Sequence, residues 1–374
     1  YDNNSDLQIK IMIAGNSYED ADNSDVALMV PTSGSTGKPK IVMLTDRQLI
    51  MNMVAYRSRF GFHGHNSVYC ALQFHHIYCI CAQILTHISI GDTFVLSNKP
   101  FFIKDFFKAV INHRISISAF VPYMAILMSD FAQSNDYDYS SLKYITISGA
   151  KTPKATYLKL TSRFKDIQFI NTYGMSEAGS RISIAAPDPA QFPPESVGRP
   201  IPGVSIRIVD SEGGILPVET TGEIEVKSTG VMKGYYKQQK LTSMTVIEGW
   251  LKTGDMGRVE KNGNLFLTGR KKDIIICGGE NIYPQEIEEC LLEHPAVREA
   301  AVIAQKDRLL QEVPCAFIVK DKDHNSSRQV DIIKYCLGRL SSHKVPRRVI
   351  FLETMPMLTS SKINRLELRK MLSS

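Results

Sequence analysis

The sequence predicts an α/β fold in which parallel sheet layers are followed by a small β-barrel-like subdomain and then by a small α+β C-terminal domain. Three observations lead to this prediction. Short β-like runs alternate with helical patterns over residues 26–172, a rhythm typical of parallel sheets covered by helices. Helical periodicity almost disappears over 196–268, where glycine and proline turns separate short β-like runs. Helices and strands mix again after residue 273.

The first region, residues 26–195, is predicted to hold the parallel sheet. Helices are expected at Asp46–Phe60 and Pro153–Phe164, between β-like runs. The expected strands are Ala27–Val30, Ser67–Leu72, Thr93–Leu96, Ile115–Val121, Tyr144–Ile147 and Ile167–Ile170.

The second region, residues 196–268, is predicted to form a small antiparallel sheet or barrel, from runs at Ser205–Val209, Gly222–Lys227 and Asn264–Leu267. Residues 1–269 together form the expected N-terminal domain, and the charged stretch 270–273 is the expected joint to a C-terminal domain of residues 274–374. The elements expected in that domain are helices at Pro284–Leu292, Arg328–Leu340 and Arg365–Leu372, and strands at Ala300–Ala304, Pro314–Val319 and Val349–Leu352.

Composition narrows the class of protein. The chain has 374 residues, 43% of them hydrophobic and 22% charged, which is typical of globular domains and excludes a disordered or fibrous protein. A net charge of +6 suits anionic small ligands but is too weak to indicate nucleic acid. Seven scattered cysteines without a CxxC pair disfavour a disulfide framework or zinc site and favour a reducing, cytoplasmic location.

The ends and the apolar stretches of the chain carry further expectations. No uninterrupted apolar run is long enough for a transmembrane segment, and the opening residues do not resemble a signal peptide. Because the chain begins at Tyr1 with a polar, acidic stretch, we expect it to be part of a longer protein.

A glycine- and hydroxyl-rich stretch directly after the first β-like run predicts a phosphate-binding loop. Its backbone N–H groups, hydroxyls and lysines suit an anion. It is not a Walker loop, because only two residues separate its glycines and a proline follows the first lysine. A flexible turn without a ligand is the structural alternative. The stretch consists of Thr32, Ser33, Gly34, Ser35, Thr36, Gly37, Lys38, Pro39 and Lys40.

Four further stretches follow in order: Asn171–Glu177 (NTYGMSE), Gly249–Asp255 (GWLKTGD), Gly269–Pro284 (GRKKD…GGENIYP) and Ser360–Ile363 (SSKI). With the loop, they resemble the motifs of the adenylate-forming, AMP-binding superfamily, which includes acyl-CoA synthetases, adenylation domains of peptide synthetases and luciferase-type enzymes. The resemblance runs from Ala27 to the C-terminus. Family members carry a substantial segment before the loop, whereas 31 residues precede it here, so we expect part of the main sheet to be missing.

The resemblance implies a two-step reaction that uses ATP, Mg²⁺ and coenzyme A. A carboxylate attacks the α-phosphate to give an acyl-adenylate, and a thiol then displaces AMP. Lys362 is implied to be the catalytic cation of the first step. Glu177, with help from Thr36, is implied to hold Mg²⁺, a hard ion that prefers oxygen ligands.

The resemblance also assigns the nucleotide contacts. Tyr173 is implied to stack on adenine, Ser176 to face the α-phosphate, and Asp255 and Arg270 to bind the ribose. The remaining implied contacts come from the rest of the loop and the second motif: Thr32, Ser33, Gly34, Ser35, Gly37, Lys38, Asn171, Thr172 and Gly174. For Asp255 and Glu177, ordinary turn positions are the structural alternative.

Lys272 occupies the family's hinge position, about which a mobile C-terminal domain is implied to turn between the two steps. Gly278 and Gly279 would then lie against the pantetheine arm of the thiol, because a missing side chain allows close approach. Gly149 and Ala150, after Ser148, are implied to line the acyl pocket. His76 resembles a residue that gates the substrate or positions its carboxylate, and a packed core histidine is the alternative.

The sequence therefore predicts an AMP-forming acyl-CoA synthetase for a fatty or aromatic acid. The segment around His76 lacks the aspartate by which amino-acid-activating relatives bind an amine, which favours a plain carboxylic acid. An adenylation domain that loads a carrier protein is the first alternative. A non-catalytic nucleotide-binding relative is the second, because Ile41 and Ser361 replace glycines that are usual in the family.

Overall fold

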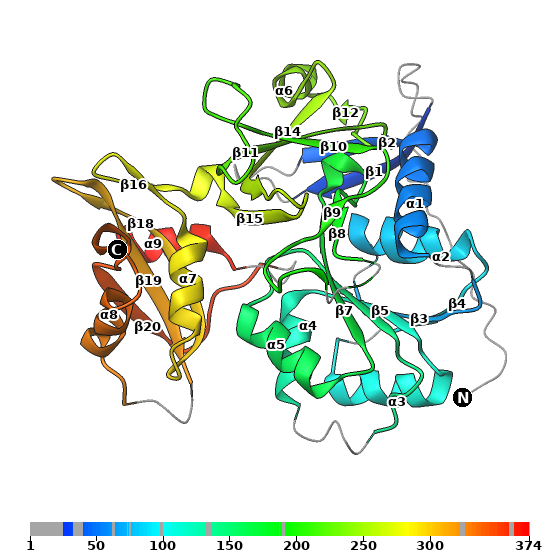
Figure 1. The fold of residues 1–374 in the computed structure, drawn as a ribbon, viewed down its shortest axis with the longest axis horizontal. Helices are drawn as coiled ribbons and strands as arrows, with labels where there is room; N and C mark the ends of the chain where they lie inside the picture. Colours follow the sequence, from blue (N-terminus) through cyan, green and yellow to red (C-terminus); the bar gives the residue numbers. More distant parts are fainter. Residues whose placement is uncertain are drawn as a thin grey trace.

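The computed structural model describes residues 25–32, 40–61, 64–72, 74, 76–97, 100–131, 137–186, 188, 191–321, 326–358 and 363–373. Figure 1 shows a large part that contains a parallel sheet below and a β-rich subdomain above, and a smaller C-terminal part at the left. In the described part of the chain, no helix combines the length and the apolar character needed to cross a membrane.

The predicted parallel sheet is confirmed. A seven-stranded sheet has the order β4-β3-β5-β6-β7-β8-β9, in which the first five strands run parallel and the last two pairings are antiparallel. The strands are β3 (Ser67–Cys70), β4 (Thr93–Leu96), β5 (Ile117–Phe120), β6 (Tyr144–Ile147), β7 (Gln168–Tyr173), β8 (Ser183–Ile184) and β9 (Arg199–Pro200).

Helices cover both faces of this sheet because successive strand residues point to opposite sides. Tyr69 of β3 packs in the cluster built with α3 (Ile103–His113), α4 (Pro122–Asp130) and α5 (Lys154–Arg163). Its neighbours Val68 and Cys70 pack in the cluster of the opposite face. The elements that supply this second cluster or adjoin it are α1 (Asp46–Phe60), the π-helix η2 (Tyr78–Leu85) and α2 (Thr86–Ile88).

Strand β1 (Val26–Thr32) corrects one prediction. The run Ala27–Val30 is not part of the parallel sheet: β1 pairs antiparallel with β2 (Lys40–Thr45), and β2 pairs with β12 (Gly234–Tyr235). The reason is the short connection between β1 and β2, since parallel neighbours need a crossover of a dozen or more residues. Strands β1 and β2 therefore pair as a hairpin, and residues 33–39 of the predicted phosphate loop, which fall between them in the sequence, lie outside the described residues.

The β-rich subdomain forms an open antiparallel sheet, so the sheet rather than the barrel is what the described residues show. Its order is β10-β11-β14-β13, and β15 also pairs with β14, further along that strand and on the side away from β11. Strand β14 was missed because glycines interrupt its β-like pattern. The elements are β10 (Val204–Val209), β11 (Gly222–Ser228), α6 (Gln239–Thr245), β13 (Val246–Ile247), β14 (Trp250–Val259) and β15 (Leu265–Arg270).

The division expected at residues 195/196 is not clean in space. Strand β9 lies beyond residue 196 and still extends the seven-stranded sheet, while the β1–β2 hairpin joins β12 from the β-rich region. Strand pairing therefore ties the two predicted subdomains together.

The C-terminal part is a small α+β unit. Its sheet has the order β17-β16-β19-β18, with β20 parallel to β19. Helices α7 and α8 cover one face and α9 the other. The elements are η6 (Lys271–Asp273), β16 (Ile275–Cys277), β17 (Glu280–Ile282), α7 (Pro284–Leu292), β18 (Val297–Asp307), β19 (Gln311–Lys320), α8 (Gln329–Leu337), η8 (Ser342–Lys344), β20 (Arg348–Leu352) and α9 (Arg365–Ser373).

Candidate active site

The predicted site residues gather where the parallel strands end. His76 follows β3, Gly149 and Ala150 follow β6, and Gly174 to Glu177 follow β7. In open α/β sheets, ligands bind in the crevice outside the carboxyl ends of the strands. The fold therefore places the acid-binding and nucleotide-binding predictions at the same edge of one sheet (Figure 1).

A three-residue cluster joins this edge to the β-rich sheet. The Tyr173 hydroxyl donates a hydrogen bond of 2.7 Å to Oδ2 of Asp255, and Arg270 Nε lies 2.6 Å from Oδ1 of the same carboxylate. Asp255 and Arg270 are direct cross-strand partners on β14 and β15. Both oxygens of Asp255 are thus held, which fixes the carboxylate in one orientation.

The pKa shifts of Tyr173 and Arg270 keep both side chains protonated, so both keep their contacts with Asp255. Burial, reinforced by the Asp255 carboxylate, raises the pKa of Tyr173 well above its usual value, so the phenol stays protonated and remains a donor. Burial disfavours the charge of Arg270, but the nearby Asp255 outweighs it and raises the pKa of the guanidinium. The sequence did not predict this positioning contact of Tyr173, and its stacking on adenine stays a prediction.

Glu177 lies in the short 3-10 helix η4 (Ser176–Ala178), together with Ser176. Its Oε1 accepts a 2.9 Å hydrogen bond from the Tyr235 hydroxyl, and its backbone oxygen accepts one from Met232 N–H. Burial, followed by the Glu177 charge, raises the pKa of Tyr235, which keeps it a donor. Lys40 Nζ lies 5.1 Å from the centre of the Tyr235 ring. Lys40, the last residue of the predicted phosphate loop, is therefore close to the tyrosine that contacts Glu177.

Magnesium fits this site. No group of three or more potential metal ligands occurs among the described residues. In nucleotide enzymes, however, Mg²⁺ needs only one or two carboxylates, because phosphates and waters complete its octahedron. The partly buried Glu177 carboxylate, oriented by Tyr235, meets that need.

Asn171 and Thr172 hold the backbone together beneath the site. The Asn171 amide donates to the carbonyls of Pro194 and Ser196, and the Thr172 hydroxyl donates to that of Ile147. Both side chains are buried. Their side chains therefore have structural partners, and the direct nucleotide contact implied for them stays a prediction.

Glycine is required at two predicted positions for different reasons. A Cβ on Gly174 would lie 1.6 Å from the Ser180 carbonyl oxygen, because the chain doubles back on itself there. Gly149 has a φ of +96°, which side chains disfavour. Its neighbour Ala150 is exposed. Both glycines shape the loops after β6 and β7.

The predicted hinge lies between two anchored residues. Lys271 Nζ is 2.6 Å from Glu223 of β11, whereas Asp273 lies 3.0 Å from Arg369 of α9. Burial, together with the neighbouring arginines, lowers the pKa of Lys272 in spite of Asp273. The residue before Lys272 therefore forms an ion pair with the large part, and the residue after it forms one with the C-terminal part.

Other predicted residues lie in the C-terminal unit or outside the described residues. Gly278 and Gly279 form the β16–β17 turn, where Gly278 N–H donates to the Leu310 carbonyl of the same C-terminal unit. Lys362 and the loop residues Ser33, Gly34, Ser35, Thr36, Gly37 and Lys38 lie outside the described residues. Thr32 is described: its hydroxyl donates to the Lys40 carbonyl and closes the base of the loop.

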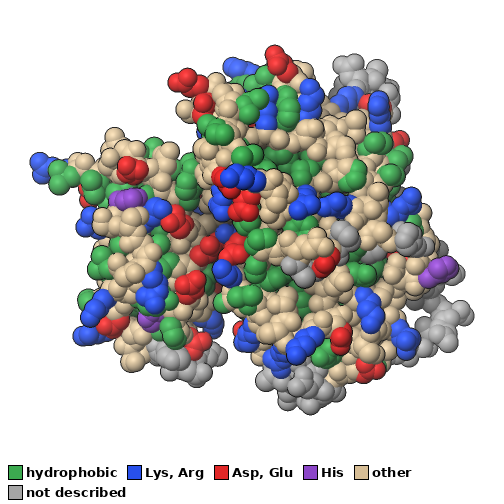
Figure 2. Space-filling view, viewed as in Figure 1, with side chains coloured by type: hydrophobic (Ala, Val, Ile, Leu, Met, Phe, Trp, Pro, Cys, Tyr) green, Lys and Arg blue, Asp and Glu red, His purple; other side chains and the backbone are tan. Residues whose placement is uncertain are grey.

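Charged side chains gather along the boundary between the C-terminal unit and the rest of the molecule (Figure 2). Lys151, directly after the predicted acyl-pocket residues, forms an ion pair with Glu289 of α7. The nearby Lys154 lies 2.6 Å from Glu195. The Lys151–Glu289 pair holds the C-terminal unit against the loop that follows β6, whereas the Lys154–Glu195 pair lies within the large part.

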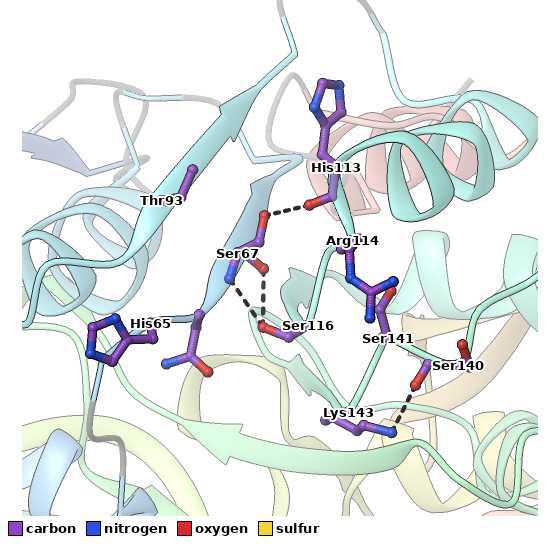
Figure 3. A pocket seen from close by; sticks show the side chains of 10 residues that line it. His65, Ser67, Thr93, His113, Arg114, Ser116, Ser140, Ser141 and Lys143 are labelled. Carbon is purple, nitrogen blue, oxygen red and sulfur yellow. Dashed lines mark hydrogen bonds between the residues drawn. The ribbon is translucent and has the colours of Figure 1, made fainter.

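A hollow of about 580 Å³ lies at the opposite, amino edge of the sheet (Figure 3). None of the predicted site residues lines it. Its cations stand beside the carboxyl end of α3, where positive charge is favourable, and Lys143 Nζ already donates to the Ser140 carbonyl. The lining residues are His65, Asn66, Ser67, Thr93, His113, Arg114, Ser116, Ser140, Ser141 and Lys143.

Two residues of the site region were not found from the sequence. Tyr235 stands 58 positions from Glu177, in a strand of only two residues, and gives no local signal. Arg181 is buried, four residues after Glu177. Its position four residues after the motif that ends at Glu177 was the only sequence feature that could have indicated it.

Comparisons with known proteins show the family to which the chain belongs. A family model described as AMP-binding enzyme matches residues 3–236, more than half of the chain, and one described as AMP-binding enzyme C-terminal domain matches residues 286–362. The chain is 33% identical over 353 residues to a 2-succinylbenzoate–CoA ligase of Bacillus cytotoxicus, an alignment that covers 93% of this chain and 71% of that protein.

Solved structures give the same result. An amide bond synthetase from Marinactinospora thermotolerans superposes with a TM-score of 0.86 and 28% identity, over 93% of this chain and 70% of that one. The o-succinylbenzoate CoA synthetase of Bacillus subtilis, in complex with its acyl-adenylate intermediate, superposes with a TM-score of 0.83 and 31% identity, over 91% and 68%. The chain therefore belongs to the AMP-binding enzyme family, the adenylate-forming superfamily that its motifs resemble.

Proposed function

We propose that this protein is an AMP-forming acid–CoA ligase for a carboxylic acid, fatty or aromatic, and that the Tyr173–Asp255–Arg270 cluster binds the ribose of its ATP. The observation that carries the proposal is the position of this cluster beside Glu177, at the carboxyl ends of the parallel strands. The CoA-ligase relatives support the reaction class. A cytoplasmic location accompanies the proposal, because all seven cysteines are free and buried.

The chemical demand on the site is electrostatic. A carboxylate must approach the α-phosphate of a polyanion, and two unit charges about 4 Å apart repel by about 4 kcal/mol at an effective dielectric near 20. Oriented cations and donors lower that barrier. Lys362, Lys38 and a Mg²⁺ ion held by Glu177 supply the charge, while Ser176 offers a hydroxyl.

The second step requires a different surface. The Gly278–Gly279 turn packs in the C-terminal unit and has no side chain to block a pantetheine arm. Rotation about Lys272, between the anchors Lys271 and Asp273, would exchange the segment that contains Lys362 for this turn. The Lys151–Glu289 pair is one contact that such a rotation must break.

The experiment is acid-dependent exchange of labelled pyrophosphate into ATP, with Lys362→Ala as the variant. We expect adenylate formation to fall by roughly 10²–10³-fold, comparable to the loss of one preorganised donor. Lys370→Ala is the matched control, because Lys370 is an exposed lysine of the same unit, 3.1 Å from Glu367. Exchange at the wild-type level in Lys362→Ala would refute the assignment.

A second assay identifies the acceptor. The adenylate formed in the first assay is offered coenzyme A, a carrier protein or an amine. Thioester on free coenzyme A supports the proposal, whereas thioester only on the carrier protein supports the first alternative. Absence of exchange with every acid supports a non-catalytic nucleotide-binding protein.

A further inference from the structure

A buried cation on the acid side of the site has an incomplete set of partners. Arg181 is 1% exposed, and its Nε and Nη2 atoms make no hydrogen bond. Within the part of the chain that the structure describes, no carboxylate forms an ion pair with it. Buried charges are normally paired, since removing a charge from water costs several kcal/mol.

Aromatic rings supply part of the missing stabilisation. The Arg181 guanidinium lies 4.1 Å from the centre of the Tyr78 ring and 5.0 Å from that of Tyr56. Tyr56, Tyr78 and the nearby Cys81 carry no negative charge at neutral pH, because burial raises the pKa of all three, to about 12 for Tyr78 and Cys81. The positive charge therefore faces rings and neutral groups, none of which balances it.

The position of Arg181 connects it to the acid rather than to the nucleotide. Tyr78 begins the π-helix η2, two residues after His76. The Tyr78 hydroxyl lies 2.8 Å from that of Thr146, two residues before Ser148 and the predicted acyl-pocket loop. A π-helix is rare and is frequently found at functional sites. Arg181 thus stands among the elements on which the acid-binding predictions fall.

The two unpartnered nitrogens have a geometry that selects a ligand. Nε and Nη2 lie on one edge of the guanidinium plane, where two parallel N–H groups match the two oxygens of a carboxylate. We propose that Arg181 binds a second carboxylate of the substrate, so that the preferred acids are dicarboxylic. This inference rests on the proposed function, because one carboxylate is activated and the other is held.

A purely structural arginine is the competing explanation. In that case the contacts with Tyr56 and Tyr78 suffice, and the charge of the acid's far end has no effect on its activation. The two explanations differ in how the enzyme treats a dicarboxylic acid and its monomethyl ester, which have nearly the same shape and differ by one charge.

The test measures kcat/KM for pyrophosphate exchange with matched pairs, each an aliphatic or aromatic dicarboxylic acid and its monomethyl ester. We expect wild type to prefer the diacid of its best pair by about 10–100-fold, the effect of one or two charge-assisted hydrogen bonds. Arg181→Met should lower that ratio to near 1. Arg181→Lys, which keeps the charge without the fork, should lower it below that of wild type.

Arg258→Met is the matched control, since Arg258 also stacks on an aromatic ring, 4.8 Å from the centre of Phe266, but belongs to the β-rich sheet. It should keep the wild-type ratio. A wild-type ratio near or below 1 in every active pair overturns the proposal, as does an unchanged ratio in Arg181→Lys if Arg181→Met fails to fold. Absence of exchange with all acids refutes the proposed function instead, and the inference with it.

Discussion

Arg270 and Arg181 lie in two regions of the candidate site and differ in exposure and in their partners. The Arg270 side chain is 45% exposed and lies 2.6 Å from Asp255, whose other oxygen is held by Tyr173. Arg181 is almost fully buried, and two of its nitrogens have no hydrogen-bond partner. Arg270 therefore has a carboxylate partner within the chain, whereas none of the described carboxylates pairs with Arg181.

The difference follows from what each side has to do. In the proposed function, the preorganised Asp255 carboxylate would stabilise the same ribose in every turnover without reorganisation of the protein. A cation that lacks an internal partner contributes to binding only when the ligand brings the matching anion, so it discriminates between ligands. On the proposals above, the comparison separates residues that would serve the common reaction from one that would select the acid.

Asp255→Asn should have the largest effect on the nucleotide side. An amide cannot accept hydrogen bonds on both atoms, so we expect kcat/KM for ATP to fall by about 10–100-fold, while the diacid-to-monoester ratio stays unchanged. Glu225→Gln is the matched control, because Glu225 is a buried carboxylate paired with Arg207 at 2.7 Å in the same sheet. An equal loss in both variants would indicate a folding effect and would break the comparison.

Replacement of each arginine should change the free energy of unfolding by different amounts. Arg270→Met leaves the Asp255 carboxylate, which is 8% exposed, without its cation, and we expect a loss of about 1–3 kcal/mol in the free energy of unfolding. Arg181→Met removes a buried charge that lacks a counterion, so its stability should stay within about 1 kcal/mol of wild type or rise. Urea denaturation measures both. A larger loss in Arg181→Met would mean that its aromatic contacts are a structural necessity.

Tyr235→Phe should have the smallest effect. Loss of the hydroxyl removes the donor that orients Glu177, and we expect the Mg²⁺ concentration at half-maximal exchange to rise by about 3–10-fold. Tyr236→Phe is the adjacent control and should keep the wild-type dependence. An unchanged Mg²⁺ dependence in Tyr235→Phe would argue against Glu177 as the metal ligand.

Local patterns determined much of the fold. The alternation of β-like runs and helices predicted the parallel sheet, because the periods of 2 and 3.6 residues are set by backbone geometry. The order of the motifs also placed Glu177, Asp255 and Arg270 among the candidates. The run Ala27–Val30 shows the limit, since a strand pattern does not specify its partner: a short connection made it half of a hairpin.

Only the tertiary structure decided the pairs that give these residues their roles. The Tyr173–Asp255 hydrogen bond spans 82 positions and the Tyr235–Glu177 bond 58, distances over which no local period carries information. The burial of Arg181 has the same origin. A single arginine in a sequence is most often on the surface, and only the packing of Tyr56 and Tyr78 around it leaves a charge without a partner.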